Sequence, residues 1–133
     1  MTIRGLKQNN LFKRQQNWIN KIKITEMDYI IIQKNGNPLT FGSVAIPNAK
    51  DDRDTIIVYG DKEDAENDFS EDEDLGIVSL TYKVNGETET TEVIFDNKKV
   101  GEFNSKFGDE ADFQEKLWDF IIIYDFVTKQ LPH

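Results

Sequence analysis

The dipeptide Asn85-Gly86 most restricts the fold of this chain, because it stands between two β-rich runs in LGIVSLTYKVNGETETTEVIF. Asn-Gly has the residues that a two-residue type I′ turn requires, so the stretch predicts an antiparallel hairpin with Tyr82 opposite Glu89. One face of that hairpin would be apolar, carrying Val78, Leu80, Tyr82, Val84, Val93 and Phe95. The other face would be polar, carrying Ser79, Thr81, Lys83, Thr88, Thr90 and Glu92. We therefore expect one buried face and one solvated face.

Further strands are expected upstream of this hairpin. The stretch DYIIIQKNGNPLTFGSVAIP has two β-rich runs around Asn35-Gly36-Asn37-Pro38, residues that favour a turn, and so predicts a second hairpin. Residues 55–59, TIIVY, predict a short strand of their own. Together the runs indicate a mostly antiparallel sheet of about five strands.

Helical spacing occurs at both ends of the chain. Leu11, Trp18 and Ile22 predict an N-terminal helix within Leu6 to Ile22, with its boundary near Asn20. A long C-terminal helix should begin after Asp109, whose side chain suits an N-cap. Its apolar stripe recurs in steps of four and three, at Phe113, Leu117, Phe120, Tyr124, Val127 and Leu131. The fold class is therefore α+β, with this long helix packed on one face of the sheet.

The C-terminal helix is more apolar than one sheet requires, because Trp118, Ile122 and Phe126 lie off the stripe. Two interpretations account for them. The N-terminal helix covers them through Leu11, Trp18 and Ile22, or a second copy of the chain covers them in a homodimer. The length of 133 residues suits a single domain spanning 1–133 in either case.

Negative charge is concentrated in residues 61–76, DKEDAENDFSEDEDLG, which hold nine carboxylates and one lysine. The whole chain has a formal net charge of −9, so this stretch accounts for nearly all of the excess. Because like charges repel and few apolar residues anchor the stretch, we expect an exposed, mobile acidic loop between strands. Such a loop would either only keep a small domain in solution or present a binding surface. Phe69 within it would either fold back onto the sheet or contact a partner.

The first 24 residues have the opposite charge, with Arg4, Lys7, Lys13, Arg14, Lys21 and Lys23 and no acidic residue. This basic segment either folds back on the acidic body or contacts a separate partner. Residues 1–24 contain no apolar run typical of a secretory signal, and no apolar run in the chain is long enough to cross a bilayer. We therefore expect a soluble, cytoplasmic protein that does not bind membranes.

The residue types present argue against most catalytic chemistry. The only histidine is the terminal His133 and there is no cysteine, so imidazole bases, thiol nucleophiles and zinc sites of the usual kinds are not expected. No phosphate-binding or dinucleotide-binding glycine motif is present. Carboxylate-based, magnesium-dependent chemistry remains as an alternative, through Asp51, Asp52 and Asp54 or through the acidic stretch. We expect no cofactor, no resident metal and no enzymatic activity.

Overall acidity, with a pI near 4.6, also disfavours direct nucleic-acid binding. A row of carboxylates can instead imitate a phosphate backbone and block a basic groove of a partner protein, as small acidic inhibitors do. By analogy of size and composition, the hypothesis is an inhibitor of a toxin, nuclease or host defence enzyme, of the immunity-protein or phage anti-defence kind. The alternative is an assembly subunit that uses its broad C-terminal helix. The candidate binding residues are Asp61, Glu63, Asp64, Glu66, Asp68, Phe69, Glu71, Asp72, Glu73 and Asp74.

Overall fold

The structure of the protein, a computed structural model, describes residues 27–45 and 53–130. Its strands are β1 (Met27–Gln33), β2 (Thr40–Ala45), β3 (Asp54–Ile56), β4 (Asp74–Asn85), β5 (Thr88–Phe95) and β6 (Lys98–Lys106). Its helices are α2 (Lys62–Asp68), α3 (Glu110–Tyr124) and α4 (Phe126–Gln130). The predicted α+β class is confirmed. The predicted N-terminal helix, together with Leu11, Trp18 and Ile22, lies outside the described residues.

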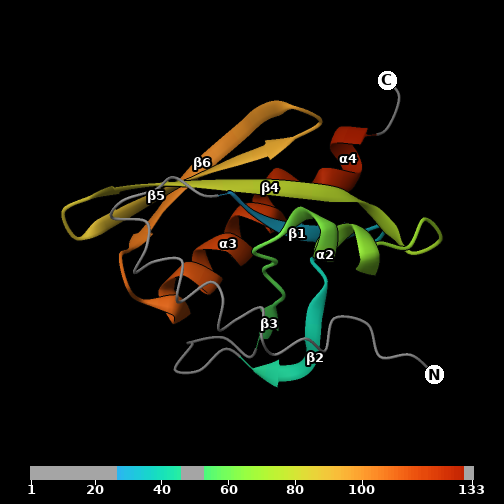
Figure 1. Cartoon of the computed structure of the whole chain (residues 1–133), viewed down its shortest axis with the longest axis horizontal. Coiled ribbons are helices and arrows are strands. Elements are labelled where there is room, and N and C mark those ends of the chain that lie inside the picture. Colours follow the sequence, from blue (N-terminus) through green and yellow to red (C-terminus); the bar gives the residue numbers. More distant parts are fainter. Residues whose placement is uncertain (1–26, 46–52, 131–133) are drawn as a thin grey trace.

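Four strands form one antiparallel sheet in the order β1-β4-β5-β6, and β2 pairs with β3 in a separate two-stranded sheet. α3 runs along one face of the large sheet, and α2 lies beside β1 (Figure 1). β1 and β4 are adjacent although residues 34–73 separate them in the chain. The chain therefore leaves the large sheet after Gln33 and returns at Asp74, which is the residue that pairs with Gln33.

The β4–β5 hairpin is present, but the predicted type I′ turn at Asn85-Gly86 is wrong. Asn85 still belongs to the ladder, where it pairs with Thr88, and the loop is Gly86-Glu87. Gly86 has a φ of 64° and Glu87 is not among the residues with positive φ, which is the pattern of a type II′ turn. Tyr82 consequently pairs with Thr91 rather than with Glu89. The change moves the register by an even number of residues, so each side chain keeps its predicted face.

β6 is a strand that the sequence analysis did not predict. It follows β5 through the two-residue loop Asp96-Asn97, in which both residues have positive φ, at 53° and 62°. This is the true type I′ turn of the sheet. β6 contains a bulge, because Val93 pairs with Gly101 while Ile94 pairs with Lys99.

The predicted turn at Asn35 to Pro38 forms, and Gln33 N–H donates to the carbonyl oxygen of Asn37 at 2.9 Å. Its arms pair only briefly, through a bridge between Ile32 and Pro38, after which β2 pairs with β3. The predicted strand at 55–59 is confirmed in its first half, which belongs to β3. Its last residue, Tyr59, instead exchanges two backbone hydrogen bonds with Tyr29 of β1, at 2.7 and 2.8 Å.

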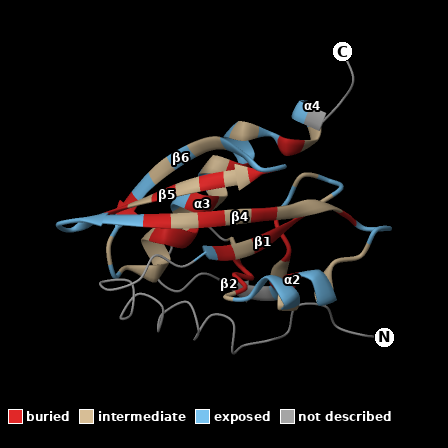
Figure 2. Cartoon of the chain, turned by 45° about the horizontal axis from the view of Figure 1, so that its top comes forward, coloured by how far each residue is buried: buried red, intermediate tan, exposed pale blue. Residues whose placement is uncertain are grey.

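The main core lies between the large sheet and α3. Alternate residues of β1, β4 and β5 point into it, as the colours along β4 indicate (Figure 2). The sheet supplies Ile30, Ile32, Val78, Leu80, Tyr82, Val93 and Phe95, and α3 supplies Phe113, Leu117 and Ile121. Gln114 joins β3 to this layer, because its side-chain amide donates to the oxygen of Ile56 and accepts from the nitrogen of Ile56, at 3.0 and 2.8 Å.

The predicted long C-terminal helix is interrupted at Asp125, which adopts the left-handed conformation with a φ of 58°. Its N–H donates to the oxygen of Ile121 and ends α3, while its carboxylate accepts from the N–H and hydroxyl of Thr128 in α4. Hydrogen bonds from that hydroxyl and that N–H hold the pKa of Asp125 below its ordinary value. The break directs Phe126 into the main core, where its ring lies 5.4 Å from that of Phe95.

This break corrects the expectation that Trp118, Ile122 and Phe126 form one surface for the N-terminal helix or a second copy. Phe126 is buried in the main core. Trp118 is half-buried against β3, with its indole N–H donating to the oxygen of Asp54 at 2.8 Å. Ile122 is 54% exposed, next to Ile123 at 82%.

A second, smaller core lies on the opposite face of the sheet, because Ile31 points away from its neighbours Ile30 and Ile32. The buried members of this second core are Ile31, Leu39, Phe41, Ile57, Tyr59 and Ala65. Ala65 is the contribution of α2, so the acidic stretch reaches the interior of the protein.

Candidate binding surface

The acidic stretch 61–76 consists of helix α2, a turn and the start of β4, so the prediction of a loop is wrong. Asp61 is the N-cap of α2 and accepts from the N–H of Glu63 at 2.8 Å. Acidic residues in the first turn, Glu63 and Asp64, favour the helix through its dipole. Ala65 is fully buried and anchors the middle of the helix. These local effects outweigh the repulsion between carboxylates.

Three predicted binding residues stabilise this segment. Asp68 accepts a hydrogen bond from the hydroxyl of Tyr59 at 2.7 Å. Asp74 is buried and accepts from the N–H of Ser70 at 2.8 Å. Phe69 packs half-buried against the second core, which is the first of its two predicted positions. These contacts hold the turn that follows α2 in place.

Six of the seven remaining carboxylates of the stretch face solvent. We call acidic surface the exposed carboxylates Asp61, Glu63, Glu66, Glu71, Asp72 and Glu73. Figure 2 shows the exposed colour over much of α2. Asp64 is half-buried on the same helix. The structure thus brings most of the predicted residues together on one segment that is anchored to the fold.

A hollow of about 230 Å³ lies beside this segment on the same face of the sheet. We call it the outer hollow, and it is lined by Tyr29, Lys62, Ile77, Ser79, Ile94, Asp96 and Asn97. Burial is the main reason why the pKa of Tyr29 lies above its ordinary value, and the charges of Asp28, Asp61 and Glu66 raise it further. Two members of the acidic surface therefore act electrostatically on the wall of the hollow.

Sequence reasoning missed the outer hollow, although a signal was present. Ile77 and Ile94 fall on the predicted polar face of the β4–β5 hairpin by simple alternation. Both are half-buried, and Ile77 packs against the second core. Apolar residues on a face otherwise made of Ser, Thr, Lys and Glu indicate a covered or recessed area of that face.

The outer face beyond the hollow, over β5 and β6, is electrically balanced. Glu92 lies 3.2 Å from the ammonium of Lys83 and 4.0 Å from that of Lys99, and Lys99 also pairs with Glu102. The hydrogen bond from Lys99 holds the pKa of Glu102 below its ordinary value. Exposed ion pairs of this kind contribute little to stability, but they cancel local charge. The charges of Lys83, Glu92, Lys99 and Glu102 are thus cancelled locally.

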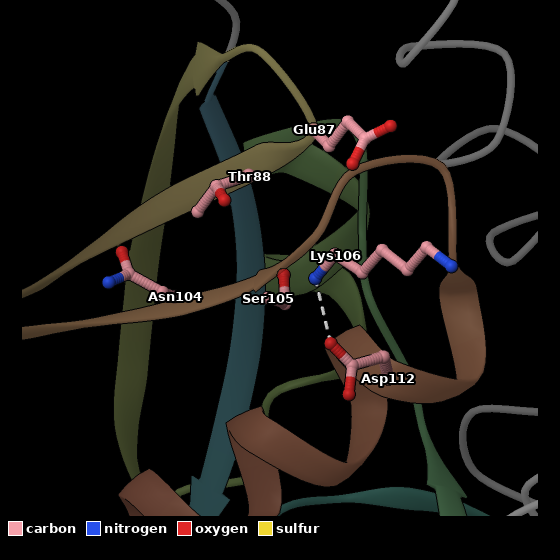
Figure 3. A pocket seen from close by; sticks show the side chains of 6 residues that line it. All are labelled: Glu87, Thr88, Asn104, Ser105, Lys106 and Asp112. Atoms are coloured by element: carbon pink, nitrogen blue, oxygen red, sulfur yellow. Dashed lines mark hydrogen bonds between the residues drawn. The ribbon is translucent and has the colours of Figure 1, made fainter.

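A second hollow, of about 340 Å³, lies between the end of β6 and the start of α3. The side chains of Asn104 and Lys106 extend to opposite sides of it, and Asp112 accepts a hydrogen bond from the backbone N–H of Lys106 at 2.7 Å (Figure 3). Asp109 caps α3 as predicted, by accepting from Asp112 N–H at 3.0 Å. The carboxylate of Asp112 thus serves the fold here, and the lining side chains do not converge on a ligand position.

Within residues 27–45 and 53–130, no group of three or more His, Cys, Asp or Glu side chains is arranged to hold a metal ion. No helix in this part of the chain combines the length and apolar character needed to cross a bilayer. Asp51 and Asp52 lie outside the described residues, and Asp54 begins β3.

Compared with known protein families, curated proteins and solved structures, the chain matches none. Function is therefore inferred from the geometry of the acidic surface and its surroundings.

Proposed function

We propose that the protein is a non-catalytic binding protein whose acidic surface engages a basic surface of a partner protein. The observation that carries the proposal is the position of Asp61, Glu63, Glu66, Glu71, Asp72 and Glu73 on one anchored segment. Because α2 is fixed by Ala65 and by the bond between Tyr59 and Asp68, binding would not require the segment to be ordered first.

The partner expected from this chemistry is a protein that binds nucleic acid or another polyanion. Its basic groove is complementary to a row of carboxylates, and electrostatic steering of this kind raises association rates by about 10- to 1,000-fold at low salt. A nuclease, a toxin or a host defence enzyme would be inhibited when this groove is occupied. The protein would then act in the cytoplasm, where such partners act.

The test is kinetic. The wild-type protein captures a partner from lysate of the native host, and association is measured over a range of salt concentrations. The test variant changes Glu63, Glu66, Glu71, Asp72 and Glu73 to their amides, and leaves intact the residues that cap or anchor α2. We expect association at low salt to slow at least about tenfold, with a flatter salt dependence.

A matched control separates this surface from net charge. Glu71→Gln with Glu73→Gln removes two charges from the acidic surface. Glu87→Gln with Glu102→Gln removes two exposed charges elsewhere, one from the β4–β5 loop and one from the middle of β6. Only the first pair should slow association appreciably. Equal effects of the two pairs, or an unchanged rate in the five-residue variant, would refute the proposal.

A second candidate function is assembly through the C-terminal helices. It is favoured by Ile122 and Ile123, adjacent apolar residues that are 54% and 82% exposed at the end of α3. Residues of this kind are enriched where another surface covers them. Sedimentation of wild type and Ile123→Glu at several concentrations tests this candidate, and a monomer in both cases excludes self-assembly.

A further inference from the structure

The outer hollow exists because a small residue lies between two large ones on neighbouring strands. Ser79 of β4 pairs with Tyr29 of β1 on one side and with Ile94 of β5 on the other. Paired residues in an antiparallel sheet point to the same face, so these three side chains form a row in which the middle one is short. Ile77 continues the floor along β4.

The lining of the hollow combines apolar and polar side chains. Tyr29, Ile77 and Ile94 supply ring and hydrocarbon surface, whereas Asp96 and Asn97 supply polar groups from the β5–β6 turn. At about 230 Å³, the hollow is smaller than the roughly 300 to 1,000 Å³ typical of small-molecule sites. Its size suits a single side chain better than a metabolite.

The charges around the hollow favour a cation. Asp96 lines the hollow, and Asp61 and Glu66 of the acidic surface are close enough to influence Tyr29. Lys62 also lines the hollow and opposes a cation there. Its side chain is long and exposed, so it can turn away at small cost.

We infer that the outer hollow receives one arginine side chain of the basic partner. The arginine stem would pack on Ile77 and Ile94, its guanidinium would lie against the ring of Tyr29, and Asp96 would accept its hydrogen bonds. This inference rests on the proposed function and deepens it, because it names the residue that anchors the complex. Arginine, tyrosine and tryptophan dominate the most important contacts of protein interfaces.

The first experiment uses a defined probe, the peptide acetyl-Gly-Arg-Gly-amide, titrated into the full-length protein and followed by NMR. We expect saturable shifts of the amide signals of Tyr29, Ile77, Ser79 and Ile94, with a dissociation constant of about 1 mM. The isosteric citrulline peptide lacks the charge and should bind at least about tenfold more weakly. Equal binding of the two peptides, or no saturable shift at these residues, would overturn the inference.

Two substitutions on β4 separate filling of the hollow from a general change of the sheet surface. Ser79→Phe fills the space between Tyr29 and Ile94 and should abolish the saturable shifts. Thr81→Phe adds the same ring two residues further along the same face, outside the hollow, and should leave binding of the peptide unchanged. Lys62→Ala removes the opposing cation and should tighten binding severalfold. If Ser79→Phe binds the arginine peptide as well as wild type does, the inference is wrong.

The captured partner distinguishes failure of this inference from failure of the proposed function. Ser79→Phe excludes the partner's arginine from the outer hollow, so the dissociation rate of the complex should rise at least about tenfold. The salt dependence of the association rate should stay the same as for wild type. Slower association of the five-residue amide variant, with unchanged dissociation of Ser79→Phe, would leave the function standing and refute the anchor. Unchanged association of the amide variant would refute the function itself.

Discussion

The two faces of the large sheet are built from the same strands but differ in what they contribute. On the α3 face, alternate residues of β1, β4 and β5 are buried under α3 and Phe126. On the opposite face, α2 covers only the part near β1, and the rest carries the outer hollow and the ion pairs around Glu92. The difference teaches that the α3 face is buried along its strands, whereas the second core buries the opposite face only near β1 and the other described residues leave the rest of it open.

This division has a physical basis in the period of two along a strand. Neighbouring residues such as Leu80 and Thr81 point to opposite faces, so each strand can be apolar on one face and polar on the other. Charge changes on the open face therefore need not disturb packing under α3. The predictions below test how complete this separation is.

The largest effect is expected for Phe113→Ala on the α3 face. Phe113 is fully buried against Tyr82 and Phe103, so its loss should reduce the free energy of unfolding by about 3 to 5 kcal/mol. Urea denaturation measures the change. The matched substitution on the open face is Ile94→Ala, which removes a half-buried side chain and should cost about 1 kcal/mol. Similar losses for the two variants would contradict the comparison.

A smaller effect is expected for Gly101→Ala, which tests how tightly the α3 face is packed. A Cβ at this position would lie 2.6 Å from the ring of Phe120, so the ring must move, at a cost of about 1 to 3 kcal/mol. Combining Gly101→Ala with Phe120→Leu should recover part of that loss. A double-mutant cycle gives the interaction free energy between the two positions. Strict additivity would show that the ring does not restrict this site.

Asp125→Ala should destabilise the break between α3 and α4 and lower the free energy of unfolding. The substitution removes both hydrogen bonds to Thr128 and places an alanine in the left-handed region. Asp125→Asn keeps an acceptor and tolerates that conformation, so it should lose less than Asp125→Ala. The midpoints of thermal denaturation rank the two variants by stability. A lower midpoint for Asp125→Asn than for Asp125→Ala would refute the role of this carboxylate as an acceptor for Thr128.

The charged carboxylate of Asp112 should stabilise the folded protein at neutral pH, and acid should remove this stabilisation. Burial raises the pKa of Asp112, but hydrogen bonds from Lys106 N–H and from the Lys116 ammonium outweigh burial and leave the pKa below its ordinary 3.8. A lowered pKa in the folded state stabilises the protein above the unfolded-state pKa, and this stability is lost as pH falls through the folded-state pKa. Near neutral pH, the free energy of unfolding of wild type should exceed that of Asp112→Asn by on the order of 0.5 to 1 kcal/mol. The difference is small because the carboxylate is partly solvated.

The control for this prediction is the same comparison in acid. The difference between wild type and Asp112→Asn should shrink steadily as the pH is lowered below about 4. A difference that stays constant, or grows, would mean that the carboxylate does not act through its charge.

The smallest effect is expected when Glu63, Glu66, Glu71, Asp72 and Glu73 are changed to amides. All five are exposed and none is the N-cap of α2, so stability should change by less than about 0.5 kcal/mol. Urea denaturation at low salt is the measurement. A loss as large as that of Gly101→Ala would show that recognition and stability are not separated.

Sequence reasoning predicted which side chains share a face more reliably than it predicted positions along the strands. Face is set by alternation, and Val78, Leu80 and Tyr82 keep theirs whichever turn forms. Register depends on whether glycine takes the first or the second turn position. Asn85-Gly86 satisfies the preference of a type I′ turn, whereas Gly86-Glu87 satisfies that of a type II′ turn. β6 was missed because its residues, KKVGEFNSK, lack an apolar alternation, as suits an edge strand.

The candidate site was predicted in composition but not in conformation. Repulsion among nine carboxylates suggested a loop, yet Asp61 caps a helix and Ala65 and Phe69, four residues apart, lie on its inner side. The outer hollow was not predicted because it requires the pairing of Ser79 with both Tyr29 and Ile94, which joins segments far apart in the chain. The local pattern shows only that Ile77 and Ile94 interrupt a polar face, and it does not show which residues lie beside them.

The excursion between Gln33 and Asp74 leaves and re-enters the sheet at paired residues, so in topological terms it is an insertion in a β-hairpin. The entropy of closing such a loop grows only with the logarithm of its length, and each doubling costs about 0.6 kcal/mol. Lengthening or shortening the turn at Glu71 and Asp72 therefore leaves the pairing of β1 with β4 nearly unaffected. Variation in length and sequence is therefore least costly at this exposed turn, whereas Asp61, Ala65 and Asp74 tie the rest of the acidic stretch to the fold.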